Sequence, residues 1–253
     1  AETAERAEKW DDAAAALDKA LSLNPRNTAL LPRRAIALIN AGKAGEARAL
    51  LQKLVDGAAS PDPATIYLLA EAQRADKDLV AAEATARKLL AANPGDTRGL
   101  HTLSSIQQER GDAKGAETTL RDLVSKDPQD ANALNSLGYL LAERADRLDE
   151  AVQLLQRAVK IEPENPSFLD SLGWAYFQQG KLTEADQPLT RAAEQLRSSS
   201  VVQEHLGDLR FKQQRFADAA SAWERALSGD GHSVDRAKIE KKIRDARARM
   251  APQ

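Results

Sequence analysis

The sequence predicts an all-α protein built as a solenoid, in which short helix–turn–helix units repeat along the chain. The first observation is a set of alanines that recur every 34 or 35 residues. This small-residue series comprises Ala13, Ala47, Ala82, Ala116, Ala151, Ala185 and Ala219. Two further series keep the same spacing: Leu17, Leu51, Ala86, Leu120, Leu155, Leu189 and Trp223, and then Ala20, Leu54, Leu89, Leu123, Ala158, Ala192 and Ala226. A fixed period of this length indicates a repeat architecture.

The stretch 165–194 shows how one unit is expected to fold. Asn165 can cap a first helix with its side-chain oxygen. Gly180 ends that helix, and Thr183 with Asp186 three residues later predicts the start of a second helix. Apolar residues recur at helical spacing in both halves. One such hairpin leaves apolar surface uncovered, so it needs a copy of itself on either side.

Small residues also mark the first helix of each unit. They are Ala35, Ala70, Ser104, Gly138, Gly173 and Gly207. Two helices approach closely only where one presents a small residue to the other. Large residues at Gly173 or Ala185 would therefore push the two helices of a hairpin apart.

A helix–turn–helix period of 34 residues with small residues at fixed sites resembles the tetratricopeptide repeat (TPR) family. The resemblance covers nearly the whole chain. It implies a right-handed superhelix of about fourteen helices without a strand. In this family the first helices of successive repeats line a concave groove that holds extended or helical peptides.

The repeats can be placed along the chain in order. Residues 1–24 are expected to form a partial repeat, with a stub of its first helix in residues 1–7. Six repeats follow at about 28–60, 63–94, 97–128, 131–163, 166–197 and 200–230, and a capping helix at 233–250. One extra residue near Ala145–Leu148 predicts a bulged turn in the fourth repeat. Pro188, inside a second helix, predicts a bend or a 3₁₀ start and not a broken helix.

The C-terminal segment Val234–Met250 is highly charged. Its thin apolar stripe consists of Ala237, Ile239, Ile243 and Ala246. A polar helix with one thin apolar stripe is typical of a cap on the last repeat. A basic arm for nucleic acid or an anionic membrane is the alternative, and the carboxylates interleaved among its lysines and arginines weaken it.

Composition excludes several partners. The net charge of −2 gives no global basic field, so we expect no nucleic acid partner. No stretch approaches the roughly 20 apolar residues of a membrane span. The absence of cysteine excludes disulfides and thiolate metal sites. Ala1 begins inside a helical pattern without a starting methionine, so we expect further repeats upstream, and a leader upstream stays open.

No constellation of residues predicts catalysis. His101, His205 and His232 lie far apart and lack partners at metal-ligand spacing, so each is expected to be an ordinary surface or groove residue. Nucleophile, phosphate-binding and metalloprotease motifs are absent from the sequence. We therefore expect no enzyme activity, no catalytic residue, no metal site and no cofactor.

The family's groove positions predict a partner-binding surface in the fourth to sixth repeats. Carried over residue by residue, it comprises Tyr139, Asp170, Trp174, Phe177, Glu204, Asp208 and Phe211. Aromatic side chains are the usual anchors of interfaces, and the carboxylates predict a preference for segments that carry Lys or Arg. The alternative is that Trp174 and Phe177 only pack between neighbouring repeats. TPR domains that clamp the C-terminal carboxylate of cytosolic heat-shock chaperones use Lys, Arg and Asn at these sites, so the carboxylates argue against that ligand.

Residues 133–227 are also similar to the C-terminal repeats of bacterial TPR proteins, through strings such as ALNSLGYLLAERADRLDEAVQLLQRAVKIEPENPSFLDSLGWAYFQQG. Several such proteins are outer-membrane lipoproteins that face the periplasm, and one type resembles an adaptor for a processing protease. This similarity favours a location in the bacterial periplasm or at the outer membrane, with the cytoplasm as the alternative.

The expected function is a non-catalytic scaffold or adaptor that binds a protein or peptide in the concave groove, in a protease or assembly complex. One alternative is the regulatory part of a larger enzyme whose catalytic domain precedes Ala1. Another is a structural module that self-associates through the open N-terminal repeat.

Overall fold

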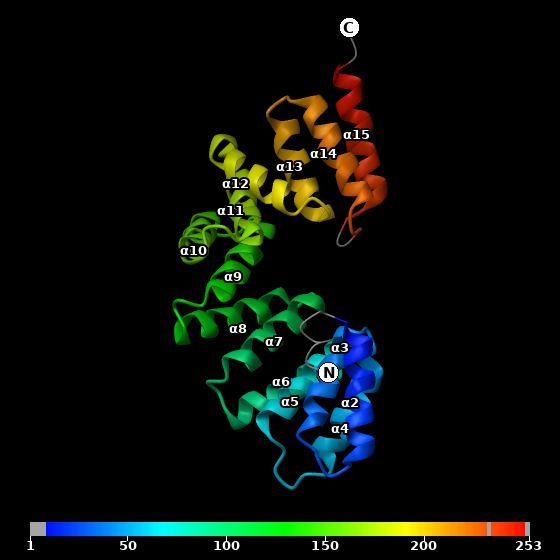
Figure 1. Cartoon of the computed structure of the whole chain (residues 1–253). Coiled ribbons are helices and arrows are strands. Elements are labelled where there is room, and N and C mark those ends of the chain that lie inside the picture. The colour runs from blue at the N-terminus through cyan, green and yellow to red at the C-terminus, as the bar shows by residue number, and fades with distance from the viewer. Residues whose placement is uncertain (1–8, 232–233, 251–253) are drawn as a thin grey trace. The chain divides into compact units, whose positions relative to one another are not determined.

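The structure is a computed structural model that describes residues 9–231 and 234–250. As the sequence predicts, these residues form fourteen α-helices and no strand. The helices are α2 (Trp10–Leu23), α3 (Leu30–Asn40), α4 (Ala44–Asp56), α5 (Pro63–Ala75), α6 (Leu79–Ala92), α7 (Thr97–Glu109), α8 (Ala113–Lys126), α9 (Ala131–Glu143), α10 (Leu148–Ile161), α11 (Pro166–Gln178), α12 (Leu182–Gln195), α13 (Ser200–Lys212), α14 (Phe216–Ser228) and α15 (Arg236–Met250) (Figure 1). The predicted stub at residues 1–7 lies outside the described residues.

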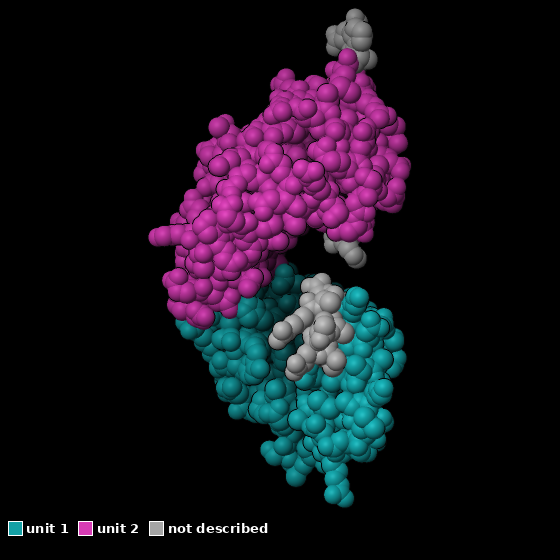
Figure 2. Space-filling model, in the orientation of Figure 1, with its two compact units in different colours: residues 1–126 teal, residues 127–253 magenta. Residues whose placement is uncertain are grey.

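Contacts divide the chain into two compact units, residues 1–126 and 127–253 (Figure 2). The first unit holds α2 to α8, and the second holds α9 to α15. Within each unit, consecutive helices pack against each other, and every first helix also contacts the first helix of the next hairpin. A bilayer crossing needs a long apolar helix, and the described part of the chain contains none.

Short turns join the two helices of each hairpin. At the end of α11, Gly180 has a φ of +75°. The Lys181 N–H donates to the Tyr176 carbonyl at 2.9 Å, and the Gly180 N–H donates to the Phe177 carbonyl at 2.8 Å. These two bonds satisfy the last carbonyls of the helix, and the left-handed residue they require is usually glycine. The prediction that Gly180 ends this helix is confirmed.

The fourth hairpin has the predicted longer turn. α9 ends at Glu143 and α10 begins at Leu148, which leaves a turn of one residue more than in the neighbouring hairpin. Ala145 and Arg147 adopt φ values of 48° and 47°, in the left-handed region. The extra residue is therefore accommodated in the turn, and both helices keep their length.

Two predictions concern how α11 and α12 begin. Asn165 caps α11, because its side-chain oxygen accepts a hydrogen bond from the Ser167 N–H at 3.0 Å. α12 begins at Leu182 without a side-chain cap, so the predicted start at Thr183 is wrong. The residue before the helix is Lys181, and its side chain forms no capping hydrogen bond. Pro188 lies inside a continuous α-helix; as predicted the helix is unbroken, and no 3₁₀ start is present.

The repeat period has a direct packing cause. All members of the small-residue series are buried at 0% exposure. A Cβ added to Gly173 would lie 2.5 Å from Leu189 Cγ, and one added to Gly207 would lie 2.4 Å from Trp223 Cδ1. A Cβ added to Gly138 would likewise lie 2.6 Å from Leu155 Cγ of the second helix in that hairpin. The first-helix glycines are therefore the contact points of their hairpins.

α15 covers the last hairpin, as predicted for a capping helix. Ile239, Ile243 and Ala246 are buried in one cluster with Ala219, Ala220, Trp223 and Ala226 of α14. Ala237 is exposed, contrary to the predicted apolar stripe. It precedes Ile239 by two residues and so points about 200° away around the helix.

Candidate partner-binding site

The residues predicted to bind a partner all lie on first helices of the second unit. They are Tyr139 on α9, Asp170, Trp174 and Phe177 on α11, and Glu204, Asp208 and Phe211 on α13. α11 contacts both α9 and α13, so the structure brings these residues onto neighbouring helices. Asp170 is buried, whereas the other members of the set are partly exposed.

Asp170 is buried because it forms a pair with His205 of α13. The Nδ1 atom of His205 lies 3.0 Å from Oδ1 and 3.1 Å from Oδ2 of the carboxylate. Both residues are 6% exposed. The prediction that His205 is an ordinary surface or groove residue is therefore wrong: it follows the groove position Glu204 by one residue, which rotates it about 100° toward α11. His101 is partly exposed, and His232 lies outside the described residues.

Two opposing effects act on the pKa of His205. Burial alone would lower it, but the charge of Asp170 and the hydrogen bond to it, helped by Glu143 and Asp208, outweigh burial. The pKa of His205 is therefore raised above its ordinary value. The imidazolium form, held against a carboxylate, contributes to the packing of α11 on α13.

The raised pKa of His205 predicts a pH-dependent stability. The folded state binds the proton more tightly than the unfolded chain, so the stabilisation is complete below about pH 6.5 and is lost as the pH rises through the folded pKa. Urea unfolding of the parent between pH 6 and 9 should show the free energy of unfolding fall with a slope of at most about 1.4 kcal/mol per pH unit. The control His205→Gln keeps a hydrogen-bonding group and should lack this slope. An equal slope in both proteins would contradict the assignment.

Trp174 of α11 stacks with two other rings, those of His205 and Phe177. Its ring lies 4.0 Å from that of His205 and 5.0 Å from that of Phe177, with interplanar angles of 13° and 14°. The contact with His205 joins α11 to α13, so Trp174 does pack between neighbouring repeats, which was the alternative to a role in binding. Trp174 and Phe177 nevertheless remain partly exposed, so packing does not use their whole surface. The Trp174 Nε1–H is buried and has no acceptor among the described residues.

Tyr139 lies beside several carboxylates. Burial raises the pKa of its phenol, and the negative charges of Glu143, Asp170 and Glu204 raise it further. The phenol therefore stays protonated at neutral pH.

The carboxylates of Glu204 and Asp208 are bound by Lys242 of α15. The ammonium nitrogen lies 2.7 Å from Glu204 Oε1, and 2.6 Å and 2.9 Å from the two oxygens of Asp208. Trp223 Nε1–H also donates to Asp208 Oδ1 at 3.0 Å. Burial would lower the pKa of Lys242, but the two carboxylates outweigh it, so the pKa is raised and Lys242 stays charged.

Phe211 lies where α13, α14 and α15 meet. Its ring contacts Phe216 at 5.3 Å and Trp223 at 5.6 Å between centroids. The Arg249 guanidinium lies 5.2 Å from the Phe211 centroid. The Phe211 ring therefore contributes to the packing of these three helices, and it also lines a pocket.

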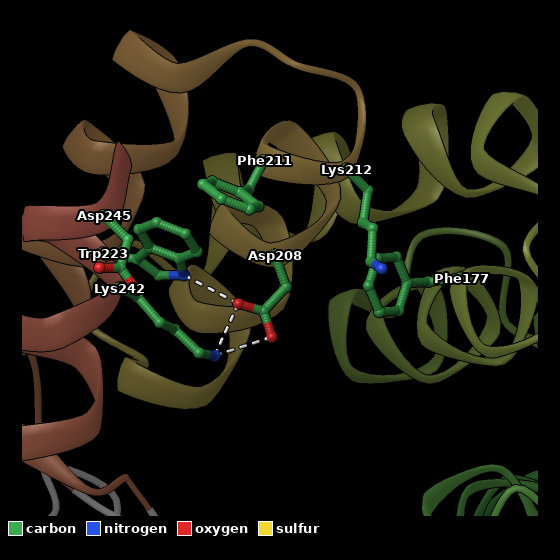
Figure 3. Close-up of a pocket in the computed structure, with 7 residues that line it drawn as sticks. All are labelled: Phe177, Asp208, Phe211, Lys212, Trp223, Lys242 and Asp245. Atoms are coloured by element: carbon green, nitrogen blue, oxygen red, sulfur yellow. Dashed lines mark hydrogen bonds and ion pairs between the residues drawn. The ribbon is translucent and has the colours of Figure 1, made fainter. Parts of the chain in front are cut away.

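We call this cavity the α15 pocket; its volume is about 240 Å³. Its lining residues are Phe177, Asp208, Phe211, Lys212, Trp223, Lys242 and Asp245 (Figure 3). Three of the seven predicted site residues, Phe177, Asp208 and Phe211, line it. The pocket therefore lies at the C-terminal end of the predicted groove, where α13 meets α14 and α15.

Comparison with known proteins decides the family. Tetratricopeptide repeat models match residues 4–72, 102–166 and 142–209, which together cover more than half of the chain. The chain belongs to the tetratricopeptide repeat family.

Individual relatives are more distant. A TPR repeat-containing protein of Pseudomonas aeruginosa is 39% identical over 62 residues, which are 24% of this chain and 10% of that protein. The match thus spans about a tenth of that relative's length. A TPR protein from Parabacteroides merdae has a TM-score of 0.72 at 16% identity, over 97% of this chain and 95% of that one. YrrB, described as a TPR protein with an unusual peptide-binding site, has a TM-score of 0.55 at 16% identity, over 76% of this chain and 97% of its own.

The sequence missed the partners of the carboxylates at the predicted groove positions. The sequence predicted that Asp170, Glu204 and Asp208 favour a partner that carries Lys or Arg, whereas the structure pairs the first with His205 and the other two with Lys242. The argument for a partner rich in Lys or Arg therefore loses its basis. Among the described residues, no group of three His, Cys, Asp or Glu side chains is arranged to hold a metal ion.

Proposed function

We propose that this TPR chain is a non-catalytic scaffold or adaptor that holds a segment of a partner protein against α9, α11 and α13. The observation that carries the proposal is the row of partly exposed aromatic side chains on α9 and α11, formed by Tyr139, Trp174 and Phe177. Aromatic anchors in preformed positions are the residues that usually dominate an interface.

The aromatic row is preorganised. Trp174 stacks with two rings, and one of these belongs to the buried His205–Asp170 pair. A side chain that is already fixed loses little conformational entropy when a partner binds. Part of the Trp174 side chain stays exposed, so a partner can contact a residue whose position is already fixed.

A peptide or an extended protein segment is the class of ligand that fits a row of side chains on successive helices. YrrB, which shares the fold, is described as having a peptide-binding site, although an unusual one. The similarity of residues 133–227 to bacterial TPR repeats extends the proposal to an adaptor of the periplasm or outer membrane, serving a protease or an assembly complex.

Site-directed cross-linking tests the binding face. The chain lacks cysteine, so a single cysteine can carry the cross-linker. Glu143→Cys places it beside Tyr139, and Gln153→Cys places it on an exposed site of the second helix α10. In the source cells, the first variant should cross-link a specific protein and the second should not.

The affinity for that protein then tests the anchor. Trp174→Ala should weaken binding at least about tenfold, which corresponds to 1.4 kcal/mol. Gln153→Ala is the matched control and should bind like the parent. Circular dichroism checks that both variants keep their helix content. Equal cross-linking from both cysteines, or an unchanged affinity of Trp174→Ala, would place the partner elsewhere.

A further inference from the structure

The α15 pocket is lined by three aromatic side chains, Phe177, Phe211 and Trp223, and by four charged side chains, of which three are ion-paired. Asp208 receives hydrogen bonds from Trp223 and Lys242. Asp245 is bound by Lys241 at 2.8 Å. The carboxylates that line the pocket therefore already have cationic partners within the chain.

Lys212 is the exception among the lining residues. It lies at the last position of α13 and is exposed, and its side chain forms no hydrogen bond or ion pair with any residue in the described ranges. In Figure 3 its side chain extends from α13 toward Phe177. The pocket thus presents aromatic surface next to the Lys212 ammonium group, which has no carboxylate partner among the described residues.

We propose that the α15 pocket receives a bulky apolar side chain of the partner segment, and that Lys212 receives a carboxylate of the same segment. This inference rests on the proposed function, because it names the chemistry of the segment that the groove would hold. An apolar side chain in contact with Phe177, Phe211 and Trp223 gains from leaving water. A carboxylate at Lys212 supplies the charge that the pocket lacks.

A basic segment is the competing occupant, and the ion pairs disfavour it. A lysine or arginine of a partner would meet the ammonium groups of Lys212 and Lys242, whereas the lining carboxylates of Asp208 and Asp245 already have cationic partners. To reach Glu204 or Asp208 it would have to displace Lys242, whose side chain is 21% exposed. Removing a largely buried cation from its two carboxylates is unfavourable unless the new pair replaces every bond.

Two small probes with the same ring and opposite charges test the inference directly. Indole-3-propionate offers an apolar ring with a carboxylate, and tryptamine offers the same ring with an ammonium group. Each is titrated into the full chain at low salt, and two-dimensional NMR spectra follow the Trp223 indole N–H and the amides at the end of α13. Indole-3-propionate should bind about 1.4- to fivefold more tightly, the range expected for one exposed ion pair.

Charge reversal at Lys212 supplies the decisive variant. Lys212→Glu should invert the preference, so that tryptamine binds more tightly than indole-3-propionate. Lys160→Glu, on an exposed site of α10, changes the net charge equally and should leave the parental preference intact. Both lysines are exposed and stand in the last turn of their helix, so the two changes should have similarly small effects on folding, which circular dichroism checks.

Three results would overturn the inference. Tryptamine binding the parent as tightly as indole-3-propionate would indicate a basic occupant. The absence of shifts at Trp223 with both probes would show that the pocket takes no such ligand. A partner whose affinity depends on Trp174 but not on Lys212 would leave the proposed function standing and reject this assignment alone.

Discussion

A Trp223→Ala variant is expected to lose about 4 kcal/mol of the free energy of unfolding of the second unit, in the range for a large buried aromatic. Trp223 is 2% exposed and belongs to the cluster that fixes α15 on α14. Its Nε1–H also donates to Asp208, which in turn holds Lys242 of α15. Removing the indole therefore leaves a cavity and weakens both the apolar and the ionic attachment of α15.

Urea unfolding and amide hydrogen exchange measure the two consequences. The exchange of the buried α15 residues Ile239 and Ile243 should accelerate more than that of α9. The matched variant is Trp223→Leu, because leucine occupies this place in the series at Leu155 and Leu189. It should recover more than half of the lost stability while still lacking the hydrogen bond to Asp208. A loss below about 1 kcal/mol in Trp223→Ala would show that α15 does not depend on this contact.

The sequence could predict the fold because the contacts that define a hairpin leave a direct trace in residue size. Gly173 and Ala185 are small since the two helices meet there, and Gly180 is a glycine since the turn needs a positive φ. The small residue of the first helix recurs in every unit, whereas the turn position with positive φ is glycine in some hairpins and Lys77 or Gln214 in others. Thr183 failed as a start signal because its capping pattern also fits the first turn of a helix that begins one residue earlier.

The partners of the groove residues could not be read in the same way. Asp170 and His205 are 35 residues apart in the sequence, and no spacing rule pairs them. Which side chain of α15 meets α13 depends on how that helix is rotated on the last hairpin. One signal was available: Lys242 follows Ile239 by three residues and precedes Ala246 by four, so it lies on the apolar stripe. A lysine in that stripe requires a carboxylate, which Asp208 and Glu204 provide.

The Gly173→Ala variant is expected to destabilise the second unit by roughly 2 kcal/mol, the opposite of what helix propensity predicts. In a helix interior, alanine is normally favoured over glycine by about 1 kcal/mol. At Gly173 the added Cβ would lie 2.5 Å from Leu189 Cγ and 3.0 Å from the Leu189 backbone nitrogen. The control Gly45→Ala lies on an exposed site of α4, where the Cβ would meet only an Asp76 oxygen at 3.4 Å. It should be neutral or slightly stabilising in the same urea measurement.

A double-mutant cycle separates this contact from general damage to α11. The second hairpin places Ala70 and Ala86 where Gly173 and Leu189 stand, and both alanines are buried. Leu189→Ala alone should cost about 2–5 kcal/mol, because it opens a cavity. The double variant Gly173→Ala, Leu189→Ala recreates the alanine pair, so its loss should be smaller than the sum of the single losses by about 0.5–3 kcal/mol. If the losses in the free energy of unfolding were strictly additive, the size of Leu189 would not be the reason for a glycine at position 173. The small residue at this place in the repeat would then reflect another constraint on the helix.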